Sequence, residues 1–262
     1  MLSFSRFSLP ASRFCGLTAL GLVALATPHP ASAQSYTSVT NFAKNGNIQQ
    51  NLQASFPSGA FTANNSFATP FNIVPDNNGN NFEQILGIGT TLTINVGAFG
   101  VSNVYILLNA YSPQPGSQIA SVEFLGSSGA DQTFTLTGGD QIRDFYQGTH
   151  ANSINGITTQ NAFSIVGPGG AGTGNVSTGL YGTYVLDEQD FQLNAAFLTQ
   201  TLHSIEITNT ANDSNPILLG LTTATPAAVP EASTTVSLGL LLMLGLGGVA
   251  IAAKRKKSAA AA

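Results

Sequence analysis

The chain has 262 residues, and only 8% of them are charged, eight basic and twelve acidic, for a formal net charge of −4. Residues 34–229 contain two basic residues, Lys44 and Arg143, against eleven acidic ones, so this part has a net charge of −9. Nucleic acid is excluded as a partner, because phosphate binding requires clustered lysine and arginine. The single cysteine, Cys15, cannot form a disulfide within the chain.

The first 33 residues have the three parts of a secretory signal peptide. Arg6 and Arg13 supply the basic region, residues 15–26 are apolar, and Ala33 ends a small-residue cleavage site. We predict cleavage after Ala33, which makes residues 1–33 the signal peptide. A retained N-terminal anchor is the alternative, but the apolar stretch is too short to cross a bilayer.

Residues 34–70 are predicted to be a loop-rich segment that places aromatic side chains in the core. Phenylalanines recur among its Asn, Ser and Gly residues and just beyond it, at Phe42, Phe56, Phe61, Phe67 and Phe71. Phenylalanine is a core residue more often than a surface residue, so we expect these rings to pack inward.

The following residues have the patterns of β-strands. Polar and apolar residues alternate in 91–96, 133–137 and 202–209, and His203, Ile205 and Ile207 are expected to share one strand face. The continuous apolar runs 104–108 and 217–219 predict strands covered on both faces. Further strands are expected at 118–125, 162–166 and 182–186, and the best helical candidate is 190–202. Gly- and Pro-rich turns between the strands predict a mostly β ectodomain over residues 34–221, a β-sandwich or jelly roll.

The central strands resemble a known class of domain. Residues 104–111, 122–124 and 134–144, the last ending in a Gly-Gly-Asp-x-x-Arg-Asp corner, are similar to the galactose-binding-like β-sandwiches of bacterial surface proteins. The resemblance implies a jelly-roll module that binds glycans or acts as a scaffold. It assigns no sugar contact to any residue.

Four residues near this corner form a candidate ligand site: Arg143, Asp144, Tyr146 and His150. Arg143 lies between Asp140 and Asp144 in the sequence, so its guanidinium either makes a bidentate hydrogen bond at a structural corner or contacts a ligand. We favour the structural role. Tyr146 and His150 are expected on a loop at one end of the sandwich, where binding residues tend to lie, so a sugar pocket there is a hypothesis.

Asp187, Glu188 and Asp190 form an acidic run that is expected on a loop. Such a run can coordinate a structural Ca²⁺, although a solvated acidic turn is the favoured interpretation, and no other cofactor is expected. Two carboxylates can also hydrolyse a glycosidic bond, but neighbouring acids on one loop do not flank a substrate. The sequence lacks a Gly-x-Ser-x-Gly elbow and metal-type histidine spacing, so we predict a non-catalytic protein.

The C-terminal residues form three consecutive parts after an expected linker at 222–229. Pro230, Glu231 and Ala232 come first, an uncharged apolar run follows at 235–253, and a basic cluster precedes a tail at 258–262. The basic cluster consists of Lys254, Arg255, Lys256 and Lys257. At ~1.5 Å per residue the apolar run gives a helix of ~28 Å, close to the hydrocarbon thickness of a bilayer. The cations would keep that end in the cytoplasm, so residues before it would lie outside.

This arrangement resembles the PEP-CTERM sorting signal, which an exosortase recognises in Gram-negative bacteria that make exopolysaccharide. The resemblance covers residues 229–257, with the sorting signal proper at 230–257. Pro230 and Glu231 match the motif, whereas Ala232 stands where the commonest form has proline. It implies an exosortase as partner and a membrane-anchored precursor.

From the sequence we therefore predict an exported, non-catalytic surface or extracellular-matrix protein. Its precursor would be anchored in the inner membrane, and the mature protein would act in the exopolysaccharide or biofilm layer, with polysaccharide as its ligand. Two alternatives stay open, namely an envelope-anchored glycan-active enzyme and an unprocessed binding module with a single membrane span.

Overall fold

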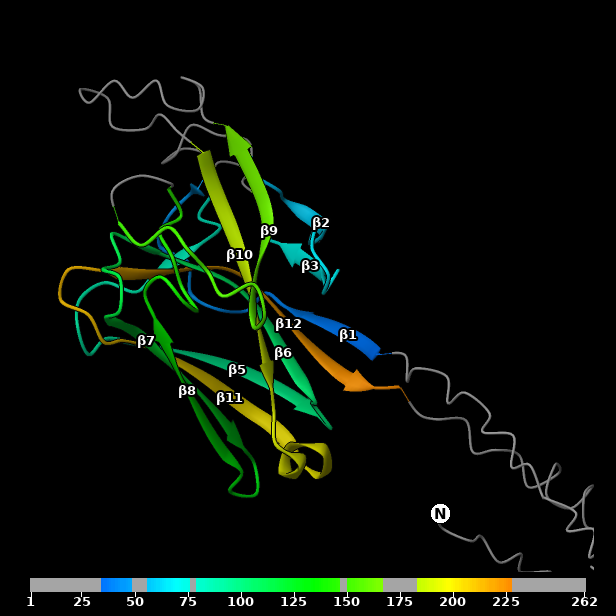
Figure 1. The fold of residues 1–262 in the computed structure, drawn as a ribbon. Coiled ribbons are helices and arrows are strands. Elements are labelled where there is room, and N and C mark those ends of the chain that lie inside the picture. The colour runs from blue at the N-terminus through cyan, green and yellow to red at the C-terminus, as the bar shows by residue number, and fades with distance from the viewer. Residues whose placement is uncertain (1–33, 49–55, 76–78, 147–149, 167–182, 228–262) are drawn as a thin grey trace, which may run out of the picture. The chain divides into compact units, whose positions relative to one another are not determined.

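The computed structural model describes residues 34–48, 56–75, 79–146, 150–166 and 183–227 (Figure 1). They form mostly β-strands, which confirms the predicted β class, and one short 3-10 helix, η1 (Ala195–Thr199). The strands are β1 (Gln34–Val39), β2 (Gly59–Thr62), β3 (Pro70–Ile73), β4 (Glu83–Gln84), β5 (Thr91–Phe99), β6 (Asn103–Tyr111), β7 (Gln118–Gly126), β8 (Asp131–Thr137), β9 (Thr159–Val166), β10 (Thr183–Gln192), β11 (Thr201–Asn209) and β12 (Asn215–Pro226).

The strands form two main antiparallel sheets and a hairpin. The six-stranded sheet has the order β1-β12-β6-β10-β9, with β4 also paired to β12, and the four-stranded sheet has the order β5-β11-β7-β8. Strands β2 and β3 pair with each other. Neighbours in both main sheets are distant in sequence, so the fold depends on long-range pairing.

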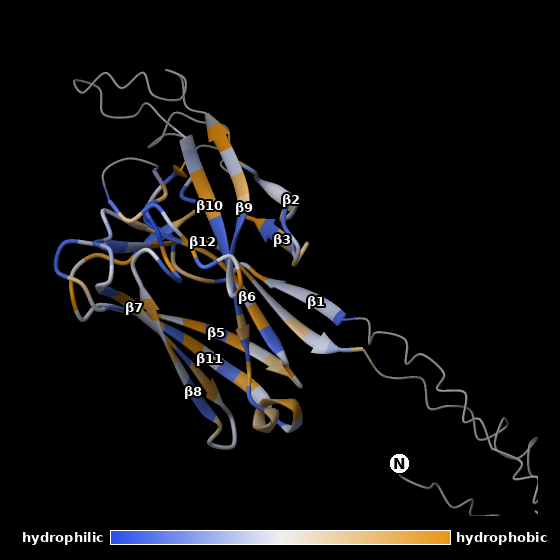
Figure 2. Ribbon diagram, viewed as in Figure 1, coloured by the Kyte–Doolittle hydropathy of each residue, from blue (hydrophilic) through white to orange (hydrophobic). Residues whose placement is uncertain are grey.

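The two main sheets enclose one apolar core, the arrangement of a β-sandwich. Along β5 and β11 polar and apolar residues alternate, as the changing colours of these strands show (Figure 2). The apolar residues Leu92, Ile94, Ile205 and Ile207 are buried. Ile94 and Ile205, which are paired across β5 and β11, are fully buried, as is Ile106 of the opposite sheet. Burial of such side chains stabilises each by about 1.5–3 kcal/mol relative to exposure.

A second apolar cluster covers the outer face of the six-stranded sheet. It includes Phe56 and Phe71 from the N-terminal segment and Tyr105 and Leu107 of β6, with Phe61 packed at its border. Strand β6 is therefore buried on both faces, as the continuous apolar run 104–108 predicts. The N-terminal phenylalanines pack inward as expected, most of them in this outer cluster.

One expected strand face differs in the structure. Ile205 and Ile207 are fully buried, but His203 is exposed while its neighbours Leu202 and Ser204 are buried. A register shift between Leu202 and Ser204, a β-bulge, turns the strand so that His203 leaves the inner face.

The two ends of the described domain also differ from expectation. Residues 34–39 form strand β1 instead of loop, and residues 222–226 continue β12 instead of forming a linker. These two pieces pair with each other, from Gln34 opposite Pro226 to Val39 opposite Leu221. The chain thus enters and leaves the sheet at one end of the β1–β12 pair (Figure 1).

The expected helix at 190–202 is mostly absent. Its first residues end β10, its last residues begin β11, and only Ala195–Thr199 are helical. Asn194 caps this helix by accepting a hydrogen bond from the Ala196 amide. Phe197 is fully buried, so burial of this ring fixes the turn between the two sheets.

Candidate functional site

Arg143 is held in a buried ion pair with Asp187, which is 44 residues away in sequence. Its Nε and Nη2 donate to the two carboxylate oxygens at 2.8 and 2.7 Å, and Nη1 donates to the Asn152 carbonyl at 3.2 Å. Asn109 donates a further hydrogen bond to Asp187 at 2.8 Å and accepts one from the Asp187 amide at 2.9 Å. The guanidinium has a structural role here, with Asp187 as its partner in place of the flanking Asp140 and Asp144.

The ion pair lies where strands β6 and β10 separate. Their pairing runs from Asn103 opposite Gln192 to Leu107 opposite Glu188 and then ends. Beyond this point the segment 143–146 lies between the strands, with hydrogen bonds from Phe145 to Ala110 at 3.2 Å and from Val185 to Phe145 at 2.8 Å. The pair satisfies the polar groups that the separation would otherwise leave buried and unpaired.

The other three candidate ligand residues lie along the same segment but have separate surroundings. Asp144 is 3% exposed and accepts a hydrogen bond from the Tyr146 amide, and burial raises the pKa of its carboxyl to about 6. The Tyr146 ring packs against Tyr184, and His150 Nδ1 lies 3.3 Å from the Gln114 amide nitrogen. None of the three cavities described below is lined by Arg143, Asp144, Tyr146 or His150.

The acidic run Asp187, Glu188 and Asp190 lies on strand β10 and is largely buried, so it is not a solvated turn. Each carboxylate has a different amide partner: Asn109 for Asp187, Asn65 for Glu188 at 2.8 Å, and Asn103 for Asp190 at 2.9 Å. Within the part of the chain that the structure describes, no three His, Cys, Asp or Glu side chains are grouped to hold a metal ion.

Glu188 on β10 lies against the segment 63–69, from which Asn65 donates a hydrogen bond to its carboxylate. It is fully buried, and burial raises its carboxyl pKa to about 7, against the opposing effects of neighbouring Thr69 and Asn65. Its Oε1 atom is buried without a hydrogen-bond partner, as is the Thr69 hydroxyl. Burial likewise raises the pKa of Asp190, on the same strand.

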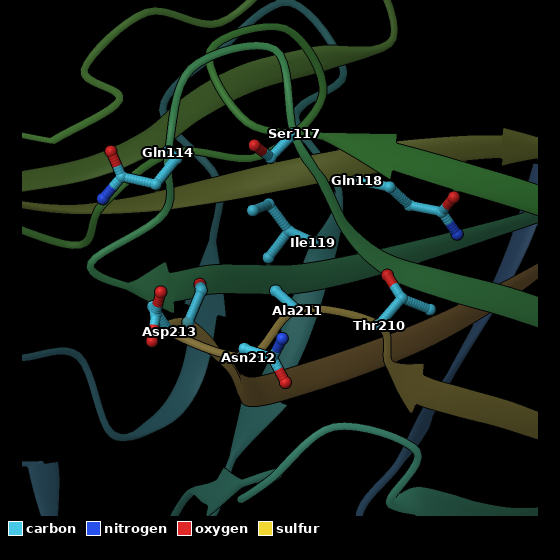
Figure 3. Close-up of a pocket in the computed structure, with 9 residues that line it drawn as sticks. Gln114, Ser117, Gln118, Ile119, Thr210, Ala211, Asn212 and Asp213 are labelled. Atoms are coloured by element: carbon cyan, nitrogen blue, oxygen red, sulfur yellow. The ribbon is translucent and has the colours of Figure 1, made fainter.

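A polar cavity of about 260 Å³ lies where two connections between strands meet (Figure 3). Gln114 and Ser117 come from the β6–β7 connection, and residues 210–214 come from the β11–β12 connection on the other side. Ile119, at the start of β7, lies between the two sets. We call this the loop-end cavity.

Buried hydrogen bonds fix the β11–β12 wall of the loop-end cavity. Asn209 is fully buried, and its amide group donates to the carbonyls of Ser214 at 2.9 Å and Ile85 at 3.0 Å. Its Oδ1 accepts from the Ala211 amide at 2.9 Å, and the Thr210 amide donates to the Ile119 carbonyl at 3.0 Å. These bonds hold the backbone of the β11–β12 connection in one conformation, which fixes where its side chains lie.

The β6–β7 wall is held by close backbone contact with Gly138. A Cβ atom at Gly138 would lie 2.3 Å from the Gln114 carbonyl oxygen, so only glycine permits this approach. Gly116 has a φ of 76°, in the left-handed region that favours glycine, and its amide donates to the Gly138 carbonyl at 2.8 Å. The glycines of the Gly-Gly-Asp corner thus support the cavity wall.

Seven of the nine residues lining the loop-end cavity are polar, and one, Asp213, is charged. The hydroxyls of Thr210 and Ser214 are buried without a hydrogen-bond partner. No pattern in the sequence marks this site, because its polar residues are ordinary loop residues and the two walls are about 90 residues apart in the chain.

Two further cavities lie elsewhere in the described residues. One, of about 180 Å³, is bounded by β8, β10 and residues 158–159. The other, of about 410 Å³, is an apolar groove formed by Phe99, Gly100, Leu198 and residues 225–227. We call the second one the exit groove, because the chain leaves the described domain there.

The targeting segments fall outside the described residues. Ala33, the sorting residues Pro230, Glu231 and Ala232, the apolar run 235–253 and the basic cluster 254–257 are not described by the structure. Among the residues that are described, no helix is both long enough and apolar enough to cross a bilayer.

Comparison with known proteins gives no family. The chain matches no protein-family model and no curated protein. One solved structure, the catalytic domain of a GH87 alpha-1,3-glucanase in complex with tetrasaccharides, is similar at 14% identity and a TM-score of 0.32. The match covers 76% of this chain and 29% of the glucanase chain. A likeness at this level establishes neither a shared fold nor a shared activity.

Proposed function

We propose that the chain is an exported, non-catalytic surface or matrix protein that an exosortase sorts through its C-terminal signal. The observation that carries the proposal is the order Pro230-Glu231, apolar run 235–253 and basic cluster 254–257. The mature protein would be a jelly-roll type of β-sandwich acting in an exopolysaccharide or biofilm layer.

The bounds of the described domain support this proposal. Strand β12 ends at Pro226, four residues before Pro230, and its last residues pair with β1. A cut at Pro230-Glu231 would therefore fall outside β12 and leave its hydrogen bonds intact. From Ala227 to the start of the apolar run is eight residues, a reach of at most about 28 Å, so the precursor domain would lie close to the membrane.

The exposed apolar residues of the exit groove are consistent with a position of the precursor domain close to the membrane. Phe99 is 65% exposed and Leu198 40% exposed, and both lie beside Pro226 and Ala227 where the chain continues toward the apolar run. Exposed apolar side chains at this end are compatible with a membrane surface or a membrane enzyme nearby. The groove contains no basic residue.

The buried state of the β10 carboxylates supports a non-catalytic role. Asp187 is neutralised by Arg143, and Glu188 is fully buried under residues 63–69. A glycosidase requires two carboxyl groups that reach opposite sides of a bound sugar. Incubation with polysaccharides should therefore give retention without released products, and product release would favour the enzyme alternative.

Intact mass of the surface-fraction protein, from a host that contains an exosortase, tests the sorting. We expect a species that begins at Gln34 and lacks residues 254–257. The variants Pro230→Ala and Glu231→Gln should accumulate as uncut precursor in the membrane fraction. Pro226→Ala, which removes an exposed proline outside the motif, is the matched control and should mature normally. A surface protein that retains the basic cluster would instead identify an unprocessed anchor.

A further inference from the structure

We propose that the end of the domain at which the chain leaves β12 contacts the lipid bilayer in the precursor, through Phe99 and Leu198. This inference deepens the proposed function, on which it rests for the membrane span at 235–253. We call this end the exit end. It consists of residues 99–102 between β5 and β6, 127–130 between β7 and β8, 193–200 between β10 and β11, and 225–227 at the end of β12.

Hydrogen bonds join these four pieces into one surface. The Gly100 amide donates to the Gln200 carbonyl at 3.1 Å, and the Ser128 amide donates to the Gln200 side-chain oxygen at 2.8 Å. The Ser102 amide donates to the Ala224 carbonyl at 2.9 Å, which ties the end of β12 to the same surface. Helix η1 lies beside the end of β5 (Figure 1). Segments that are distant in sequence therefore form one continuous end of the sandwich.

The exit end contains no charged residue, although residues 34–229 have a net charge of −9. Asp131, the first residue of β8, directly follows it in the chain. The opposite end of the sandwich includes Asp140 and Asp213 in its connections. Anionic lipid headgroups repel carboxylates. The exit end is thus the end of this acidic domain that can approach a bilayer with the least repulsion.

Phe99 and Leu198 are the large apolar side chains that the exit end exposes, at 65% and 40%. Both line the exit groove of about 410 Å³, together with residues 225–227. Phe99 ends a strand of the four-stranded sheet and residues 225–227 follow from the six-stranded sheet, so the groove crosses the open end of the sandwich. Phenylalanine and leucine are among the side chains that bury at the boundary between headgroups and acyl chains.

The path of the chain identifies the bilayer as the partner. Ile88 is 56% exposed, so exposure alone does not select a surface. Ile88 belongs to the opposite end, where the neighbouring Gly89 amide donates to the carbonyl of Asn209, the last residue of β11. The apolar run 235–253 begins only eight residues after Ala227, a reach of at most about 28 Å. Such a span would hold the exit end nearest to the lipid.

The contact would depend on apolar insertion instead of charge. The two basic residues of the domain lie elsewhere: Arg143 is paired with Asp187, and Lys44 donates to the carbonyls of Thr40 and Phe42. A single myristoyl chain binds a membrane only marginally, and two side chains bury less apolar area. The span must therefore hold the domain in place for the contact to persist, and the contact would end when a cut removes the span.

This contact would also place the sorting motif. Pro230 follows Ala227 by three residues, which reach at most about 11 Å. A domain that rests on its exit end would thus keep Pro230 and Glu231 close to the headgroups, where an enzyme embedded in the membrane can reach them.

Tryptophan fluorescence of the full chain in nanodiscs tests the proposal, because the protein has no tryptophan of its own. Phe99→Trp and Leu198→Trp report on the exit end, and Ile88→Trp is the matched control at the opposite end. Each chain is produced in a host without an exosortase and placed in phosphatidylcholine discs with or without bromine on one acyl chain. Bromine should quench the two exit-end variants about twofold, because their rings would lie ~5–10 Å into the headgroup and acyl boundary. Ile88→Trp should be unaffected.

A second substitution shows whether the apolar side chains cause the contact. In the Leu198→Trp chain, Phe99→Asp should abolish most of the quenching, because a carboxylate is costly to remove from water. Ile88→Asp in the same chain is the matched control and should leave the quenching unchanged. Both sites are largely exposed, so the circular dichroism spectrum and melting temperature should stay close to those of the parent chain.

Three results would overturn the proposal. These are no quenching of the exit-end variants in discs that contain the chain, equal quenching of Ile88→Trp, and quenching of Leu198→Trp that Phe99→Asp leaves unchanged. If quenching is absent but Phe99→Asp blocks maturation in a host with an exosortase, the exit end binds protein instead of lipid.

The proposed function can fail separately from this inference. A chain that does not enter the discs would lack the span, which overturns both. A chain that enters them without quenching overturns only the lipid contact, and the intact mass reports a failure of exosortase processing independently of the fluorescence.

Discussion

Adjacent acidic residues of β10 have opposite electrostatic surroundings. Asp187 is fully buried but accepts two hydrogen bonds from the Arg143 guanidinium, whereas fully buried Glu188 accepts a hydrogen bond from the neutral Asn65 amide. A buried charge is tolerated when it is paired and is costly when it is not. The two residues should therefore respond to neutralisation in opposite ways.

Asp187→Asn should strongly destabilise the domain. The variant keeps the size of the side chain but leaves the Arg143 guanidinium buried without a counter-charge, which costs about 3–5 kcal/mol. Urea unfolding measures the loss of free energy. Asp131→Asn, at an exposed strand end, should change stability by less than about 0.5 kcal/mol. Similar stabilities for the two variants would mean that the ion pair does not hold the β6–β10 separation.

Glu188→Gln should stabilise the domain at neutral and higher pH. The folded-state pKa of Glu188, about 7, lies above the ordinary glutamate value of 4.5, so between these two pH values the folded state retains the proton while the unfolded state loses it. Stability therefore falls as pH rises from about 4.5 to 7, by on the order of 3 kcal/mol for this one group.

The variant removes this decrease, because glutamine does not ionise. Its unfolding free energy at pH 8 should exceed that of the wild type. It should also depend less on pH between 5 and 7 in urea titrations, because the folded-state pKa of Glu188 is about 7. A smaller slope from Asp144, with its pKa of about 6, would persist. An identical pH profile for wild type and variant would contradict the predicted role of Glu188.

On the outer face of the four-stranded sheet, two like charges stand opposite each other. Glu206 of β11 is paired in register with Glu123 of β7, and their other neighbours, Thr93 and Thr133, are uncharged. Like charges directly opposite on antiparallel strands destabilise a sheet. Repulsion between these two carboxylates therefore lowers the stability of the β7–β11 pairing on its solvent-facing side.

Glu206→Lys should remove this cost and add an attraction across the strands. The expected gain in unfolding free energy is about 0.2–1 kcal/mol at low salt, and it should shrink at high salt because the pair is partly exposed. Glu206→Gln, which removes only the repulsion, should gain less. A salt-independent gain would point to altered strand propensity instead of charge.

The strands that could be predicted are those with a local signal. Alternation identifies β5, β8 and β11, and continuous apolar runs identify β6 and the middle of β12, because burial on one or both faces imposes those patterns. Strand β1 and the end of β12 have mostly polar residues, with β1 largely exposed. Strand β1 pairs only with β12, and the end of β12 pairs with both β1 and β6. No local pattern reports partners that lie more than 100 residues away in sequence.

The residues of the candidate sites, like the strands, could be predicted only where the local sequence carries a signal. The structural role of Arg143 could be predicted from its place among acidic residues at a corner, but its partner could not. Asp187 becomes its neighbour only where β6 and β10 separate in the folded sheet. The loop-end cavity has no sequence signal, since its walls come from connections that only the folded sheets bring together. The β-bulge that exposes His203 is likewise a tertiary feature.

At the scale of the whole domain, pairing of its two ends should govern its stability. We expect residues 34–227 to unfold cooperatively, whereas residues 34–221 should be far less stable, because the shorter chain lacks nearly all β1 partners and part of the β6 pairing. Circular dichroism during heating compares the two. If both melted at the same temperature, residues 222–226 would be a linker after all.

Strand β12 also determines how the domain would bear mechanical load. It has the loop-end cavity at one end and the chain exit at the other, and it is hydrogen-bonded to β6 on one side and to β4 and β1 on the other. Tension between the loop-end side of the domain and its C-terminal end would run along this strand. Such a pull shears its backbone hydrogen bonds together instead of peeling them one by one, so the domain would resist stretching in the direction in which a matrix is strained.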